Sequence, residues 1–233
     1  MSAPVEAPVV LVHGWAGSFA ETWQSTGIDA LLEDGGRSVI GVDLLGHGTA
    51  DKPHDPDAYA DLHLWLLERL SGEPVPVDAV GFSLGALTLL RALLTEPGRF
   101  GKMVLAGIGD GVFENPDPAR GRAIVAALEG TGDAADTGAQ VFAGYANAPG
   151  KDKTALTAIM KRPPAEPLDP AHLAGVPNEV LVVIGDKDFA APAERLAAAF
   201  PNGRLVVLRN TDHFATPESF PFIDAVLGFM GAA

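Results

Sequence analysis

Short apolar runs alternate with amphipathic segments along most of the chain. The apolar runs predict buried strands at Pro8–Val12, Arg37–Asp43, Val77–Phe82, Met103–Ala106, Glu179–Ile184 and Arg204–Leu208. Apolar residues at helical spacing predict helices at Glu21–Leu32, Ala58–Leu70, Leu84–Leu94, Pro192–Phe200 and Phe220–Met230. Because strands that are apolar throughout need cover on both faces, this alternation predicts an α/β fold with a mostly parallel central sheet and helices on both faces.

A long interruption, from about Asp110 to about Val176, breaks the alternation. It predicts three helices and no strand, at Pro118–Glu129, Ala134–Ala146 and Lys153–Lys161. Their apolar faces favour a small helical lid over the carboxyl edge of the sheet, where open α/β sheets place their sites. We expect this lid to be inserted after the sixth strand. The predicted division is an α/β core at residues 1–109 and 177–233 and a lid segment at residues 110–176.

Composition narrows the function classes. The 233 residues suit one domain with a modest insertion, and the absence of cysteine excludes disulfides, thiolate metal sites and a cysteine nucleophile. A net charge of −14 argues against nucleic-acid binding, which needs a basic surface. The N-terminus, Met1–Pro8, has neither a basic region nor a long apolar one, and no stretch approaches the ~18 apolar residues of a membrane helix. We therefore expect a cytoplasmic protein without membrane attachment.

The segment Gly81-Phe82-Ser83-Leu84-Gly85 has the pattern G-x-S-x-G between a predicted strand and a predicted helix. A turn this sharp needs glycine on both sides, because a side chain at Gly81 or Gly85 would collide with the neighbouring strand or helix. Ser83 then lies at the apex, beside the backbone N–H groups that begin the helix. This placement predicts Ser83 as a nucleophile.

A serine hydroxyl is a poor nucleophile at neutral pH and needs a base, for which histidine is suited. His213 follows the last strand and precedes the last helix, so its loop can reach Ser83. We expect His13 to hold its own loop, and we assign no catalytic role to the remaining histidines: His47, His54, His63 and His172.

A carboxylate must fix the tautomer of the base. Asp186 and Asp188 both follow the strand at 179–184, at the expected edge of the sheet. Either of them gives the chain order serine, aspartate, histidine.

Over nearly all its length the chain resembles the α/β-hydrolases. The matching motifs are His13-Gly14-Trp15-Ala16-Gly17-Ser18, Asp43-Leu44-Leu45-Gly46-His47-Gly48, Gly81–Gly85, Gly185-x-x-Asp188 and the loop of His213. The resemblance implies Asp188 as the acid and Asp186 as a solvated or loop-capping neighbour. Asp110 is a lesser rival, because some relatives carry the acid after the earlier strand. The sequence departs from the family at Leu45, often Pro or Arg, and at Thr49-Ala50, where Ser is usual.

By the same resemblance, the backbone N–H groups of Trp15 and Leu84 form an oxyanion hole. These features together predict a serine hydrolase, with neither cofactor nor metal, that cleaves a small or medium hydrophobic ester through an acyl-enzyme on Ser83. The alternatives are thioester or carbon–carbon bond hydrolysis, or a lyase or perhydrolase reaction, on the same triad. A hydrolase-like receptor for small molecules is a further alternative.

Overall fold

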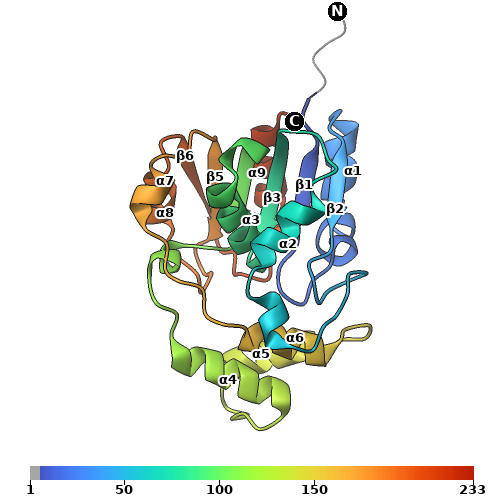
Figure 1. Ribbon diagram of the computed structural model, residues 1–233, viewed down its shortest axis with the longest axis vertical. Helices are drawn as coiled ribbons and strands as arrows, with labels where there is room; N and C mark the ends of the chain where they lie inside the picture. The colour runs from blue at the N-terminus through green and yellow to red at the C-terminus, as the bar shows by residue number, and fades with distance from the viewer. Residues whose placement is uncertain (1–5) are drawn as a thin grey trace, which may run out of the picture.

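A six-stranded sheet runs through the computed structural model, which describes residues 6–233. The strands are β1 (Val9–Val12), β2 (Val39–Val42), β3 (Val77–Phe82), β4 (Phe100–Ala106), β5 (Val180–Gly185) and β6 (Gly203–Leu208). Their order is β2-β1-β3-β4-β5-β6 and every neighbouring pair is parallel (Figure 1). All six carboxyl ends therefore lie at one edge. The N-terminal segment Met1–Pro8, from which we expected a cytoplasmic protein, lies partly outside the described residues.

Helices cover both faces of the sheet, which confirms the predicted fold class. They are α1 (Ile28–Asp34), α2 (Leu62–Arg69), α3 (Leu84–Thr95), α4 (Pro118–Glu129), α5 (Thr137–Ala146), α6 (Lys153–Lys161), α7 (Pro170–Leu173), α8 (Glu194–Ala199) and α9 (Phe220–Met230). Helices α2, α3 and α8 pack on one face, and α1 and α9 pack on the other (Figure 1). Strand β1 alternates accordingly, with Val10 and Val12 facing the first layer and Val9 and Leu11 facing the second.

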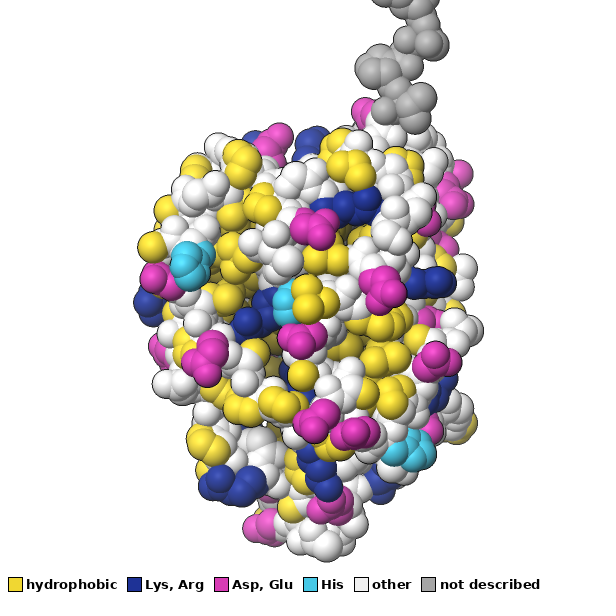
Figure 2. All heavy atoms as spheres, in the orientation of Figure 1, with side chains coloured by type: hydrophobic (Ala, Val, Ile, Leu, Met, Phe, Trp, Pro, Cys, Tyr) yellow, Lys and Arg dark blue, Asp and Glu magenta, His cyan; other side chains and the backbone are white. Residues whose placement is uncertain are grey.

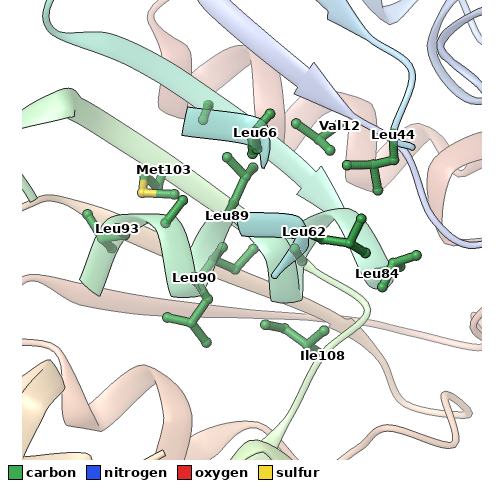
Figure 3. Close-up of a cluster of buried hydrophobic side chains, with 14 of the residues drawn as sticks. Val12, Leu44, Leu62, Leu66, Leu84, Leu89, Leu90, Leu93, Met103 and Ile108 are labelled. Atoms are coloured by element: carbon green, nitrogen blue, oxygen red, sulfur yellow. The ribbon is translucent and has the colours of Figure 1, made fainter. Parts of the chain in front are cut away.

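The larger core lies between the sheet and the pair α2 and α3. Leu66 of α2, Leu89 and Leu93 of α3 and Met103 of β4 are fully or almost fully buried, and Figure 3 shows them converging on one space. Burying each such side chain contributes about 1.5–3 kcal/mol. This packing holds the start of α3 in place against the sheet. None of the helices described in residues 6–233 has the length and apolar character needed to cross a membrane.

Two predicted helices are broken in the structure. The pattern predicts one helix over Glu21–Leu32, but a short π-helical turn at Ala20–Gln24 is followed by α1, which begins only at Ile28. Gly27 lies between them with φ 75°, a left-handed conformation that interrupts the helical hydrogen bonds. The segment predicted as Ala58–Leu70 likewise divides into a 3₁₀ turn at Pro56–Tyr59 and helix α2. Apolar spacing alone did not reveal either break.

The three helices predicted between Asp110 and Val176 are present as α4, α5 and α6, and they lie together beyond the carboxyl edge of the sheet (Figure 1). Each begins at an aspartate whose carboxylate accepts a backbone N–H of the first turn: Asp117, Asp136 and Asp152. The expectation that the insertion follows the sixth strand is wrong. Among the described residues only β1 and β2 precede β3, so the insertion follows the fourth strand, β4, and precedes β5 and β6.

The lid segment contacts the rest of the chain through polar groups as well as apolar ones. Three such contacts are the Trp15 indole N–H to the Leu156 carbonyl (3.1 Å), His54 with Asp152 (3.0 Å) and Lys151 with Glu21. All three come from α6 or the residues just before it. The division into core and lid as separate parts stays a prediction.

Candidate active site

Ser83 lies at the apex of the turn from β3 into α3, with φ 52° and ψ −113°. A non-glycine residue rarely adopts this conformation, and such strain is often stored at functional sites. A Cβ added at Gly81 would lie 2.8 Å from the backbone of Ala86 in α3, and one at Gly85 would lie 2.3 Å from the Val12 carbonyl of β1. Both neighbours are backbone atoms that cannot move aside. The two glycines therefore permit the close packing that forces the turn.

Two further loops bring His213 and Asp188 to Ser83. His213 follows β6, and Asp188 follows β5. The Ser83 Oγ and the His213 Nε2 are 2.9 Å apart, and the His213 Nδ1 is 2.9 Å from both carboxylate oxygens of Asp188. A neutral imidazole that donates Nδ1–H to Asp188 leaves Nε2 free to accept the hydroxyl proton. His213 and Asp188 are buried, and Ser83 is half-buried.

The two other candidate carboxylates are engaged elsewhere. Asp186 Oδ1 accepts the Thr211 backbone N–H at 3.3 Å, which ties the loop after β5 to the loop after β6. Asp110 accepts the backbone N–H groups of Leu196 (2.8 Å) and Arg195 (3.3 Å) in the first turn of α8. Of the three, the structure brings only Asp188 to His213.

The loop after β1 carries Trp15 beside this group. Within residues 6–233, the backbone N–H groups of Trp15 and Leu84 donate to no acceptor. Ala16, next in the chain, has φ 60°, and its N–H donates to His47 Nε2 at 3.0 Å. His47 thus pins the loop one residue beyond Trp15 in a conformation that alanine rarely adopts.

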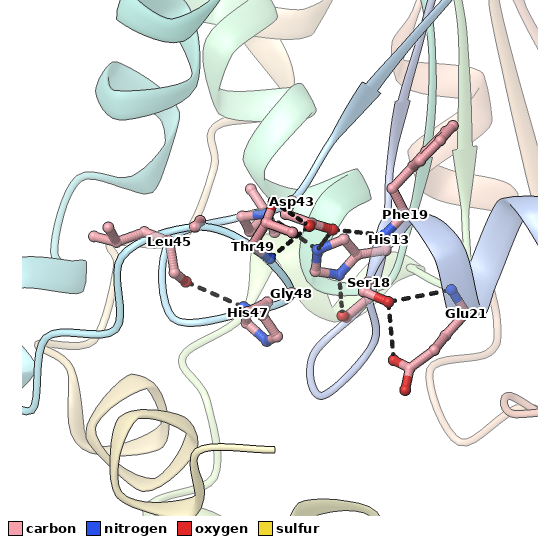
Figure 4. Close-up of polar contacts among 12 residues, drawn as sticks. His13, Ser18, Phe19, Glu21, Asp43, Leu45, His47, Gly48 and Thr49 are labelled. Carbon is pink, nitrogen blue, oxygen red and sulfur yellow. Dashed lines mark hydrogen bonds and ion pairs between the residues drawn. The ribbon is translucent and has the colours of Figure 1, made fainter. Parts of the chain in front are cut away.

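His13, in the loop after β1, makes the corresponding contact to the loop after β2. The Leu44 N–H donates to His13 Nε2 at 3.0 Å, and the His13 Nδ1–H donates to the Gly14 carbonyl at 2.7 Å. The His47 Nδ1–H donates to the Leu45 carbonyl at 3.1 Å (Figure 4). The loops after β1 and β2 are therefore joined by two histidines, each of which accepts one backbone N–H and donates one ring N–H.

Both bridging histidines are held neutral. Burial lowers the pKa of His13 from 6.5 to about 4. Burial, together with the nearby ring of His13, lowers the pKa of His47 to about 3. A protonated ring could no longer accept the backbone N–H at Nε2, so charging either histidine would break a bridge.

Asp43 completes this network. Burial acts to raise its pKa, but hydrogen bonds from Phe19 N–H (2.7 Å) and from the Thr49 N–H (2.7 Å) and hydroxyl (2.9 Å) outweigh burial and lower it below 3.8. The Thr49 hydroxyl accounts for one departure from the family motif, because it can donate this hydrogen bond as a serine would.

A cavity of about 330 Å³ opens over Ser83 and His213. Its aromatic lining comes from Trp15, Phe82, Phe142, Tyr145 and Phe214. Phe142 and Tyr145 belong to α5, so the lid segment supplies part of the wall. Phe189, beside Asp188, lies 4.2 Å from the His213 ring between centroids. From the sequence we expected only an apolar face on the second lid helix, and we did not single out Phe189 or Phe214, although each adjoins a predicted catalytic residue.

The remaining histidines lie away from this cavity. His54 pairs with Asp152, His63 lies on α2, and His172 is exposed on α7. Among residues 6–233, no cluster of three His, Asp or Glu side chains is arranged to hold a metal ion.

The buried histidines predict that the protein loses stability as the pH falls. Both have an ordinary pKa of 6.5, against about 4 for His13 and about 3 for His47 in the fold. Between the folded and unfolded pKa of each histidine, only the unfolded chain binds the proton. The contribution of each histidine to the free energy of unfolding is therefore complete above pH 6.5 and is lost as the pH falls toward about 4 for His13 and about 3 for His47. Near pH 5 each histidine adds a slope of about 1.4 kcal/mol per pH unit to the free energy of unfolding.

Urea unfolding between pH 7 and 4.5 measures this slope. We expect His47→Gln, whose amide can keep both backbone hydrogen bonds, to have roughly half the slope of the wild type. The control His172→Gln should leave it unchanged. An unfolding free energy that is flat over this range in the wild type would contradict the neutral state of the two bridges.

Two enzymes of known activity are similar to this chain in sequence. A 2-hydroxy-6-oxononadienedioate/2-hydroxy-6-oxononatrienedioate hydrolase of Pseudomonas putida is 30% identical over 252 aligned positions, which cover 95% of this chain and 87% of the relative. A pimeloyl-[acyl-carrier protein] methyl ester esterase of Methylococcus capsulatus is 38% identical over 102 residues, and that match spans only 35% of the esterase's length and 42% of this chain.

Solved structures share the fold. A hydrolase from Pseudomonas aeruginosa PA01 superposes with a TM-score of 0.74 at 24% identity, covering 99% of this chain and 92% of its own. The sequence model described as "Alpha/beta hydrolase family" matches residues 9–225. With nearly the whole chain matched, this protein belongs to the α/β-hydrolase family of enzymes.

Proposed function

We propose that this enzyme is a serine hydrolase in which Ser83 is the nucleophile, His213 the base and Asp188 the residue that orients the base. The observation that carries the proposal is the continuous chain of 2.9 Å contacts from the Ser83 hydroxyl through both ring nitrogens of His213 to the Asp188 carboxylate. A solvated carboxylate near the histidine would serve less well, because burial keeps the Asp188 contact free of competing water.

In the proposed reaction, Ser83 Oγ attacks a carbonyl carbon while its proton passes to His213 Nε2. The carbonyl oxygen becomes an oxyanion, which accepts hydrogen bonds from the Trp15 and Leu84 N–H groups. His213 returns the proton to the leaving group, and an acyl group stays on Ser83. His213 then takes a proton from water as the water oxygen attacks the acyl carbon. The resulting tetrahedral intermediate collapses by breaking the bond to Ser83 Oγ, which regains the proton from His213 Nε2, and the acid is released.

The cavity supports a small or medium hydrophobic acyl substrate. Its volume of about 330 Å³ is near the lower end of ligand pockets. Aromatic side chains make up much of the wall, which favours an apolar acyl or alcohol group. Lys151 and Glu21 also line the cavity and pair with each other, so their charges are partly compensated. These features favour esters over peptides.

A second candidate is hydrolysis of a carbon–carbon bond beside a ketone. The observation that favours it is the 30% identity, over almost the full length of both chains, to a relative named as a hydrolase of a 2-hydroxy-6-oxo dienedioate. The same serine, histidine and oxyanion donors would serve that reaction, since the carbonyl is again the group attacked. The substrate decides between the two candidates.

A product-profile assay tests the function. We expect purified protein to hydrolyse p-nitrophenyl esters of short and medium fatty acids faster than acyl thioesters or 2-hydroxy-6-oxo dienoates. Ser83→Ala should lower that turnover by at least about 10⁴-fold, because the nucleophile and base act as one unit. The exposed control Ser38→Ala should keep wild-type turnover.

Faster turnover of the dienoate would move the assignment to the second candidate. No turnover at all, together with no labelling of Ser83 by a fluorophosphonate, would indicate a binding protein. Activity near wild type in Ser83→Ala would remove Ser83 from the mechanism.

Three conservative variants identify the acid. We expect Asp188→Asn to lower turnover by up to about 10⁴-fold, because an amide favours the wrong tautomer of His213. Asp186→Asn and Asp110→Asn should change it by less than about tenfold, since each carboxylate only accepts backbone N–H groups in loops or at a helix start. Steady-state kinetics on one ester measures all three. If Asp110→Asn lowered turnover strongly and Asp188→Asn lowered it only slightly, the acid would be Asp110.

A further inference from the structure

A second hollow, larger than the Ser83 cavity, lies between α3 and the lid segment. It has a volume of about 630 Å³ and is lined by residues from four segments, 59–63, 84–91, 111–121 and 160–167. It shares no lining residue with the Ser83 cavity. We call it the arginine groove, because Arg91 of α3 and Arg162, just after α6, both line it.

The two guanidinium groups are sparsely paired. Arg91 donates one side-chain hydrogen bond, to the Glu166 carbonyl at 2.6 Å, and Arg162 donates one, to the Ile159 carbonyl at 2.7 Å. Each guanidinium has five N–H groups, so most of them are left for another acceptor. Within residues 6–233, neither arginine forms an ion pair with a carboxylate.

The two positive charges also lie close enough to affect one another. Burial lowers the pKa of Arg162, and the charge of Arg91 lowers it further. Burial lowers the pKa of Arg91 as well. Both side chains are half-buried, so water reaches part of each guanidinium, and two like charges placed together favour an anion between them.

The chain as a whole is acidic, with a net charge of −14. Of the two buried arginines among the described residues, Arg37 is paired with Asp78 at 2.6 Å, whereas Arg99 donates to the Glu73 carbonyl at 3.2 Å and forms no ion pair. Three acidic residues line the arginine groove, but all are exposed: Glu114, Asp117 and Glu166. The Asp117 carboxylate caps α4. The groove therefore contains two cations with no carboxylate of residues 6–233 at ion-pair distance, while three exposed carboxylates share its lining.

The rest of the lining is mainly apolar and stiff. Leu84, Leu87, Val112 and Met160 supply hydrophobic surface. The segment 162–167 contains three prolines, whose fixed φ angles restrict the backbone of this wall. On the face that carries α2 and α3, Figure 2 shows basic side chains among hydrophobic ones above the lid helices, with acidic side chains beside them.

We propose that the arginine groove binds an amphiphilic anion, with a carboxylate or phosphate head between Arg91 and Arg162 and an apolar chain along Leu87 and Met160. Arginine suits such heads because its fork of N–H groups matches two oxygens of the anion. The site is separate from Ser83, so its occupation does not depend on the hydrolytic reaction.

Isothermal titration calorimetry tests the proposal with four probes: octyl phosphate, octanoate, 1-octanol and inorganic phosphate. Measurements on the wild type and on Ser83→Ala should agree, which separates this site from the proposed catalysis. We expect the two octyl anions to bind with dissociation constants below about 1 mM, octanol and inorganic phosphate to bind more weakly, and added salt to weaken only the anions. Comparison of octyl phosphate with octanoate identifies the preferred head.

Variants locate the site. Arg91→Gln and Arg162→Gln should each weaken octyl anion binding by about tenfold or more, because each removes a charge-assisted hydrogen bond. The exposed control Arg69→Gln changes the charge equally and should leave binding unchanged. Absence of anion binding to the wild type would overturn the proposal, and this result needs no variant to fold. Binding that persists unchanged in Arg91→Gln and Arg162→Gln would also overturn it, by placing the anion elsewhere.

Discussion

The close approach of α3 to β1 is the constraint on which the site depends. Gly85 lies so near the Val12 carbonyl that no side chain fits between them. This contact fixes the first turn of α3 at the end of β1, and Ser83 is left in a strained conformation at the edge of the sheet. The buried leucines of α2 and α3 supply the packing that maintains this arrangement against the strain. The position of Ser83 is therefore a consequence of backbone packing as much as of its own contacts.

The loop that carries Trp15 needs separate support, because it has no sheet or helix pairing of its own. His13 and His47 provide it by accepting the N–H groups of Leu44 and Ala16. Their burial keeps both rings neutral, which is the state in which they can accept. The geometry of the proposed oxyanion donor at Trp15 is thus tied to the loop after β2, which takes no direct part in the proposed chemistry.

Local sequence signals predicted the features whose cause is local. The glycine pattern around Ser83 predicts the turn, because any side chain at Gly81 or Gly85 would clash with backbone atoms close to the turn. Helices α4 and α6 have the predicted bounds, because apolar spacing lies within each helix. Helix α5 begins three residues later than predicted, at Thr137, where Asp136 caps it. The helix predicted over Glu21–Leu32 is interrupted at Gly27, whose left-handed φ turns the chain before α1 begins. Apolar spacing does not indicate which backbone conformation a glycine adopts.

Features that join distant segments could not be predicted in the same way. Asp188 and Asp110 both follow strands, and only the three-dimensional structure separates the partner of His213 from the residue that contacts the start of α8. The family resemblance favoured Asp188 but did not supply this contact. The bridge from His47 to Ala16 and the shared groove of Arg91 and Arg162 likewise bring together residues far apart in the sequence. No local pattern indicates either of them.

The central claim is that a substrate acyl group is transferred to Ser83. Rapid acid quenching of wild-type protein during turnover of a p-nitrophenyl ester, followed by mass spectrometry of the intact protein and its peptides, tests this claim directly. We expect a mass increase of one acyl group, located on the peptide that contains Ser83 and absent from Ser83→Ala. An acyl group found on another residue while product forms at the wild-type rate would contradict it.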